Sequence, residues 1–96
     1  MHVVLYTHSR LPVHGYGGTQ RVVAWLARGL VALGQRVTLI APAGSAVPEA
    51  RVTEFETRDM ARTGFNLDRL VPGDADIVHA HAPLPTPISC PLVFTL

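Results

Sequence analysis

Two short stretches of this sequence contain the residue types that could do chemistry, and the first is a cluster of glycines. Residues 13–19 read VHGYGGT, and an apolar-periodic segment follows directly. Glycine lets the backbone approach a ligand closely, while the free N–H groups and the dipole at a helix start favour an anion. Gly17, Gly18 and Thr19 are therefore the candidates for binding a phosphate group.

The glycine cluster differs from two common phosphate-binding fingerprints. Gln20 stands where the last glycine of the dinucleotide-binding pattern G-x-G-x-x-G would fall. A P-loop would need a Gly-Lys-Ser/Thr step, which does not follow. The alternative without a ligand is a flexible entry to a helix. The cluster alone favours the flexible entry, whereas its position in the expected fold favours the phosphate site.

The second stretch contains two histidines. His79 and His81 are two residues apart in a predicted strand, so their side chains point to the same face of the sheet. Such a pair could ligate a metal ion, and His8 and His14 could complete a four-histidine site. No cysteine or carboxylate joins the pair, so we predict no metal site. We expect His79 to be half-buried at the end of the sheet, and His81 is the better functional candidate.

One helix is expected to follow the glycine cluster. It is predicted to run from a cap at Thr19 to about Leu33, and Gly34 occupies the place of a left-handed C-cap residue. Its apolar residues recur in steps of four, four and three, and Trp25 at their margin is expected to cover the sheet. The predicted stripe consists of Val22, Leu26, Leu30 and Leu33, flanked by Val23 and Ala27.

Short apolar runs predict four strands, and the alternating residues 51–56 predict another strand, at an edge of the sheet. His2 in the first strand is expected to have no role. The segment 83–91 contains four prolines, which remove backbone donors and restrain the preceding residues, so we predict an extended loop there. Residues 66–71 are expected to form one helical turn. The strands are predicted at residues 2–6, 37–41, 51–56, 76–80 and 92–96.

Strand–helix–strand units with continuously apolar strands indicate an α/β fold, in which a parallel sheet is covered on both faces. The expected strand order is 3-2-1-4-5, part of a doubly wound, Rossmann-like sheet. In that topology ligands bind outside the carboxyl ends of the strands, where the strand order reverses. The reversal lies between the first and fourth strands. The loops after these strands, which hold the glycine cluster and His81, are therefore predicted to form the site.

Composition narrows the class of protein. The net charge is +1 and the basic residues are scattered, so we expect no binding to nucleic acid or to a membrane surface. Cys90 is the sole cysteine and cannot form an internal disulfide, which favours a reducing compartment. The apolar run near the N-terminus, residues 3–7, is too short for a signal peptide or a membrane span. We therefore predict a cytoplasmic protein.

At this point the residues resemble a known family. The stretch GYGGTQRVVAWLARGLVALGQRVTLIAP, residues 15–42, resembles the first βαβ unit of the family 4, or group 1, glycosyltransferases of GT-B fold. DADIVHAHAPLP resembles their fourth strand and its loop, and PLVFTL resembles the strand that usually continues into a His-Gly step. The resemblance implies a retaining glycosyltransferase of hexosyltransferase type. Such an enzyme moves a sugar from a nucleotide-sugar donor to an acceptor, with no metal or other cofactor expected.

The resemblance also implies roles for individual residues. The donor diphosphate would lie against the glycine cluster, that is, Gly17, Gly18 and Thr19. The acceptor cleft would be lined by His14, Tyr16, His79 and His81, with His79 at its floor and His81 at its lip. The acceptor itself is not identified by these residues.

The chain ends at Leu96, where the resemblance places a histidine near the reacting sugar as the next residue. The family's second domain, which grips the donor, is absent as well. Residues 1–96 are thus predicted to be one incomplete domain with no catalytic residue of its own, and inactive alone. Two alternatives stay open: a non-catalytic nucleotide- or phosphate-binding half-domain, and a self-associating remnant of a truncated gene.

The last strand is predicted to recruit a second copy of the chain. No charged residue occurs between Ala80 and Leu96, and one face of the last two strands, with Ile77, Leu92 and Phe94, is expected to be poorly covered. An uncharged edge with unpaired N–H and C=O groups pairs readily with another strand. We expect a homodimer through residues 92–96 or by exchange of the segment 83–96.

Overall fold

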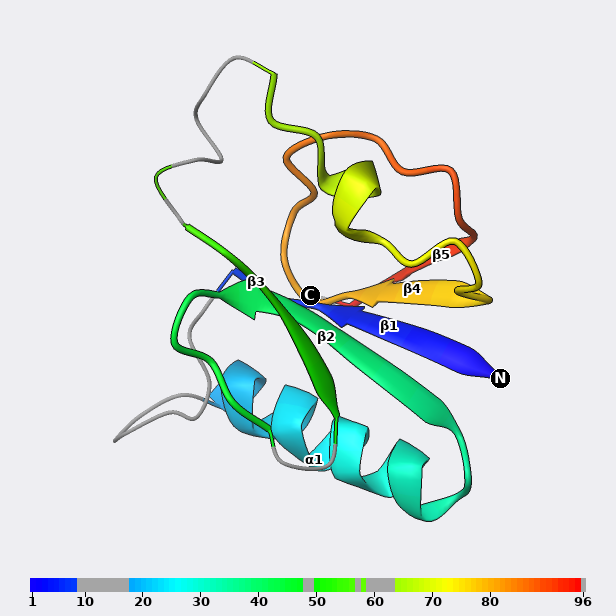
Figure 1. Cartoon of the computed structure of the whole chain (residues 1–96). Coiled ribbons are helices and arrows are strands. Elements are labelled where there is room, and N and C mark those ends of the chain that lie inside the picture. Colours follow the sequence, from blue (N-terminus) through cyan, green and yellow to red (C-terminus); the bar gives the residue numbers. More distant parts are fainter. Residues whose placement is uncertain (9–17, 48–49, 57, 59–63, 96) are drawn as a thin grey trace.

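The fold is a five-stranded parallel sheet with helical elements on both sides (Figure 1). The computed structural model describes residues 1–8, 18–47, 50–56, 58 and 64–95. The sheet has the order β3-β2-β1-β4-β5, as predicted, and every neighbouring pair is parallel. The elements are β1 His2–Tyr6, α1 Gly18–Ala32, β2 Arg36–Pro42, β3 Arg51–Phe55, the 3-10 turn η2 Leu67–Leu70, β4 Ile77–Ala80 and β5 Leu92–Phe94.

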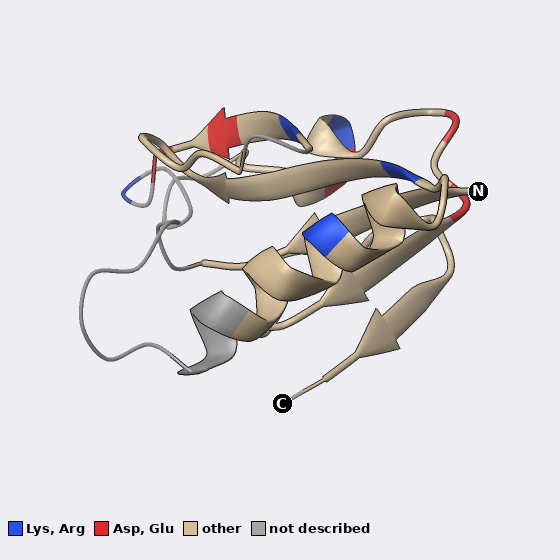
Figure 2. Ribbon diagram, turned by 90° about the horizontal axis from the view of Figure 1, so that it is seen from below, with Lys and Arg blue, Asp and Glu red and all other residues tan. Residues whose placement is uncertain are grey.

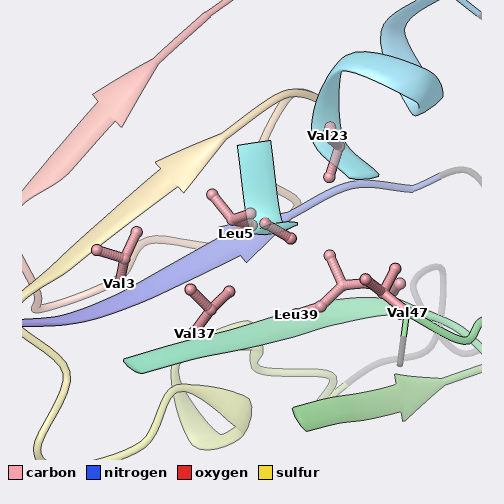
Figure 3. Close-up of a cluster of buried hydrophobic side chains, with 8 residues drawn as sticks. Val3, Leu5, Val23, Val37, Leu39 and Val47 are labelled. Carbon is pink, nitrogen blue, oxygen red and sulfur yellow. The ribbon is translucent and has the colours of Figure 1, made fainter. Parts of the chain in front are cut away.

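The central strands are buried on both faces, which explains why their sequences are continuously apolar rather than alternating. Every residue of β1 is buried, and β2 is buried from Val37 onward. The odd-numbered side chains of β1 and β2 pack under α1, where Leu5 and Leu39 are fully buried, and Figure 3 shows this cluster. The even-numbered side chains, including Tyr6 and Ile40, pack toward η2 and the segment 81–91.

The face of α1 that packs on the sheet differs from the predicted apolar stripe. Val23 and Ala27 are fully buried, whereas Val22 is 48% exposed and Leu33 is 77% exposed. Trp25, expected to cover the sheet, is 62% exposed. The small side chains at 23 and 27 let the helix backbone lie close to β1 and β2. Leu26, Leu30 and Val31 flank this contact and are partly buried.

The ends of α1 confirm one predicted cap and correct the other. Gly34 has a φ of 82°, and its N–H donates to the carbonyl of Val31 at 2.9 Å. The N–H of Gln35 donates to the carbonyl of Leu30 at 3.0 Å, which completes a Schellman motif. At the other end the helix begins at Gly18, so Thr19 lies inside its first turn and is not the predicted N-cap.

The opposite face of the sheet is covered by short, non-helical or barely helical segments. η2 confirms the predicted turn, and the Asn66 side chain caps it by accepting from the backbone N–H of Asp68. The segment 83–91 contains no helix, as its prolines predict. A hydroxyl of this segment, Thr86 Oγ1, accepts from the N–H of Leu67 at 2.9 Å and joins the two pieces.

His2 has a structural role, so the prediction that it has no role is wrong. Its ring is buried, with Nε2 2.7 Å from Thr38 Oγ1 and Nδ1 3.1 Å from Asp74 Oδ1. Its backbone N–H donates to the Asp76 carboxylate at 2.6 Å. Arg36 forms an ion pair with Asp74 beside it. These contacts connect β1, β2 and the entry to β4 at the amino edge of the sheet.

None of the helices among the described residues is both long enough and apolar enough to cross a membrane.

Candidate functional site

The carboxyl ends of β1 and β4 meet at the point where the strand order reverses. The N–H of His81 donates to the carbonyl of Tyr6 at 2.9 Å, and the N–H of Thr7 donates to the carbonyl of Ile40 at 3.1 Å. These bonds hold the ends of three strands in one layer. The amino end of α1 lies at this same edge (Figure 1). Open α/β sheets bind ligands at such a switch point.

The glycine cluster is only partly within the described residues. Gly18 and Thr19 are the first two residues of α1, so their backbone belongs to the helix turn whose N–H groups lack intrahelical acceptors. A helix start of this kind offers donors and a positive dipole end to an anion. Gly17, His14 and Tyr16 lie outside the described residues.

The structure brings His79 and His81, hereafter the histidine pair, into ring contact. Their ring centroids are 4.2 Å apart, and the planes are tilted by 32°. His79 is in register with Leu5, a residue of the cluster under α1, so the pair lies on the α1 side of the sheet. His79 is half-buried, as predicted, and His81 is the more buried of the two, only 8% exposed.

A third side chain, Thr95, joins the histidine pair, and sequence reasoning missed it. Its Oγ1 lies 2.7 Å from His79 Nε2. The register that pairs His79 with Val93 puts Thr95, two residues on, on the same face of the sheet. Spacing along the sequence does not reveal this contact, because it depends on the register between β4 and β5.

Burial favours the uncharged form of His81. Removal from water lowers its pKa below the ordinary value, and the neighbouring charge of His79 lowers it further. His81 Nε2 is inaccessible to water and has no hydrogen-bond partner among the described residues. A neutral imidazole with a free ring nitrogen can accept from or donate to a hydroxyl group. The pair is therefore suited to a neutral polar ligand group.

We expect the His81 ring to titrate below its ordinary pKa of 6.5. Replacing His79 with alanine should raise the pKa of His81, because it exposes the ring to water and removes a neighbouring positive charge. NMR titration of the ring C–H signals measures both values, with His8→Ala as the control at an exposed histidine. A His81 midpoint at or above 6.5, or one that His79→Ala leaves unchanged, would contradict this account of the pair.

The lowered pKa of His81 also makes the free energy of unfolding depend on pH. Between the lowered pKa of His81 and 6.5, the unfolded chain binds more protons at this ring than the folded chain does. The contribution of His81 to the free energy of unfolding is therefore fully present above 6.5 and declines as the pH falls through the lowered pKa.

The described part of the chain holds no metal cluster at the histidine pair, and one pocket lies at the opposite edge of the sheet. No group of three or more His, Cys, Asp or Glu residues is placed to hold a metal ion there. A pocket of about 370 Å³ lies instead near the amino ends of β4 and β5, lined in part by Asp68, Ser89 and Cys90. Ser89 donates to Asp68 through both its hydroxyl and its backbone N–H, which lowers the pKa of that carboxyl. These bonds connect the segment 83–91 to η2.

Comparison with known proteins gives one family. The family model of Glycosyltransferase Family 4 matches residues 16–96, which is most of the chain. The match includes the start of α1, the histidine pair and Thr95. Neither the curated proteins nor the solved structures contain a match to this chain.

Proposed function

Because the chain belongs to glycosyltransferase family 4, we propose that it forms the acceptor-side part of a retaining, hexosyltransferase-type enzyme of GT-B fold. Such an enzyme transfers a sugar from a nucleotide-sugar donor to an acceptor. The observation that supports this best is the meeting of two features at one edge of the sheet. The start of α1 suits an anion, and the histidine pair suits a neutral hydroxyl.

In this proposal the two features serve different substrates. The backbone at Gly17, Gly18 and Thr19 faces the donor diphosphate, because helix-start N–H groups complement its charge. The acceptor lies against the histidine pair, with His14 and Tyr16 as further contacts. A neutral His81 can hydrogen-bond to an acceptor hydroxyl without attracting a competing anion. No metal or other cofactor is part of the proposal, since the residues named bind through hydrogen bonds and the helix dipole.

Substitution of Gly18 tests the donor half of this proposal. We expect Gly18→Val to abolish binding of UDP or inorganic pyrophosphate, because a branched side chain at the helix start would block the approach of the phosphates. Gly29→Val is the matched control, since a Cβ at Gly29 meets no atom within 4 Å and the position lies in the same helix. Chemical-shift titration measures both variants. Loss of binding in the control as well would assign the effect to the helix rather than to the site.

Catalysis should be absent from residues 1–96 alone. Glycosyl transfer needs donor and acceptor held together, and positioning supplies much of the rate. We expect no transfer or hydrolysis of a nucleotide sugar by this chain, and binding no tighter than about millimolar, the level of a few weak contacts. Turnover above the background without enzyme would contradict the assignment of this chain to the acceptor side only.

We also propose a compartment and a partner for the chain. A reducing compartment such as the cytoplasm is supported by Cys90 being the only cysteine in the sequence. A second copy of the chain is the proposed partner, bound through β5 or by exchange of the segment 83–96. All three residues of β5 are exposed and apolar, and β5 is the edge of the described sheet. An edge of this kind can pair with the same strand of another copy.

A further inference from the structure

Thr95 is held in place by backbone contacts that do not need its side chain. Its N–H donates to the carbonyl of Ala80 at 2.9 Å, continuing the ladder between β4 and β5. The residue itself is exposed. Its hydroxyl is therefore free to serve another purpose, and it lies 2.7 Å from His79 Nε2.

The contact with Thr95 restricts the ring of His79. One ring nitrogen is engaged with the hydroxyl, which can bond to either tautomer and limits rotation of the imidazole. The ring is then placed against His81, with centroids 4.2 Å apart. A chain of contacts thus runs from the end of β5 to a buried ring on the end of β4.

At the end of this series of contacts is a nitrogen without a hydrogen-bond partner among the described residues. His81 Nε2 is inaccessible to water and makes no hydrogen bond with the described residues, although buried polar groups normally have one. Nε2 is covered in this structure, so a ligand hydroxyl would supply that bond once the neighbouring atoms move aside. The ring of His79 lies against that of His81, with the planes tilted by 32°, and limits how the His81 ring can turn.

We propose that Thr95 is a positioning residue: its hydroxyl holds His79 against His81, so that His81 Nε2 is oriented to hydrogen-bond with a hydroxyl of the acceptor. This inference rests on the proposed function for the acceptor side, and it adds a residue outside the predicted site.

Two substitutions separate the hydroxyl of Thr95 from its bulk. Thr95→Val keeps the shape and removes the hydrogen bond, whereas Thr95→Ser keeps the hydroxyl. We expect Thr95→Val to move the ring ¹⁵N signals of His79 toward those of a free imidazole and to shift those of His81, with Thr95→Ser close to the wild type. Thr53→Val, a half-buried threonine on β3, is the control for a general threonine-to-valine effect.

The thermal midpoint should change little in Thr95→Val, since the backbone ladder remains. Unchanged histidine signals in Thr95→Val would overturn the proposal. Equal changes in Thr95→Val and Thr95→Ser would also overturn it, because they would show that bulk rather than the hydrogen bond matters.

A polyol probe tests the ligand class. Methyl α-D-glucoside at high concentration should shift the His81 ring signals in the wild type and in Thr95→Ser, and should shift them less in Thr95→Val. No shift in the wild type would overturn the hydroxyl assignment. These readouts require no donor, so loss of diphosphate binding at Gly18 would count against the proposed function while leaving the Thr95 result to be judged separately.

Discussion

Replacing Val23 with aspartate is expected to unfold the chain, whereas the same replacement at its neighbour Val22 should leave it folded. Val23 is fully buried under the sheet, and Val22 is 48% exposed. An unpaired charge in the core costs several kcal/mol after relaxation, which approaches the total stability of about 5–15 kcal/mol of a typical domain. Urea unfolding followed by circular dichroism measures the difference between the two variants.

The two valines form a matched pair, since they share the helix, the residue type and the substitution. The predicted stripe through Val22 would give the opposite order of stabilities. A larger loss of stability for Val22→Asp than for Val23→Asp would show that α1 packs through that stripe and not through the face described by the structure.

Self-association should be detected most directly as a doubling of the mass of the particle in solution. We expect residues 1–96 to sediment as a dimer at micromolar concentration, and Phe94→Lys to sediment as a monomer. Leu92, Val93 and Phe94 are 44%, 43% and 44% exposed, so both faces of β5 present apolar surface. Figure 2 shows no Lys, Arg, Asp or Glu on β5 that would oppose pairing.

Leu33→Lys is the control for this prediction, because Leu33 is an exposed leucine in the turn directly after α1. It should leave the dimer intact. A monomeric wild type, with Phe94→Lys unchanged in mass and solubility, would contradict pairing through β5.

The structure corrects one detail of the predicted apolar face. Ile77 lies on the opposite face of the sheet from Leu92 and Phe94, because the register pairs those two with Val78 and Ala80.

The order of elements and the place of the candidate site were predicted from local sequence, and the structure confirms the order of elements. Continuous apolar runs identified the buried strands, since a strand covered on both faces has no polar side. Prolines excluded a helix from 83–91, because the ring removes a donor and restrains the preceding residue. Parallel strands with one crossover helix then give the strand order and its reversal between β1 and β4. Each of these inferences rests on short-range covalent and steric rules.

The buried face of α1 was decided only by tertiary structure. Apolar residues occupy neighbouring rows of α1, such as Val22 and Val23, so periodicity permits two overlapping stripes. Close packing selects the stripe with the smaller side chains, Val23 and Ala27, and leaves Trp25 exposed. The choice depends on the shape of the sheet beneath the helix, which no window along the helix contains.

Contacts between distant residues were likewise decided by the fold. His2 bonds to Thr38 and Asp74, and His79 bonds to Thr95, although 16 or more positions separate the partners in each case. The residue types were visible in the sequence, but their pairing depends on strand register. A shift by one residue would turn each side chain to the other face of the sheet, so only the assembled strands bring these polar groups within hydrogen-bond distance.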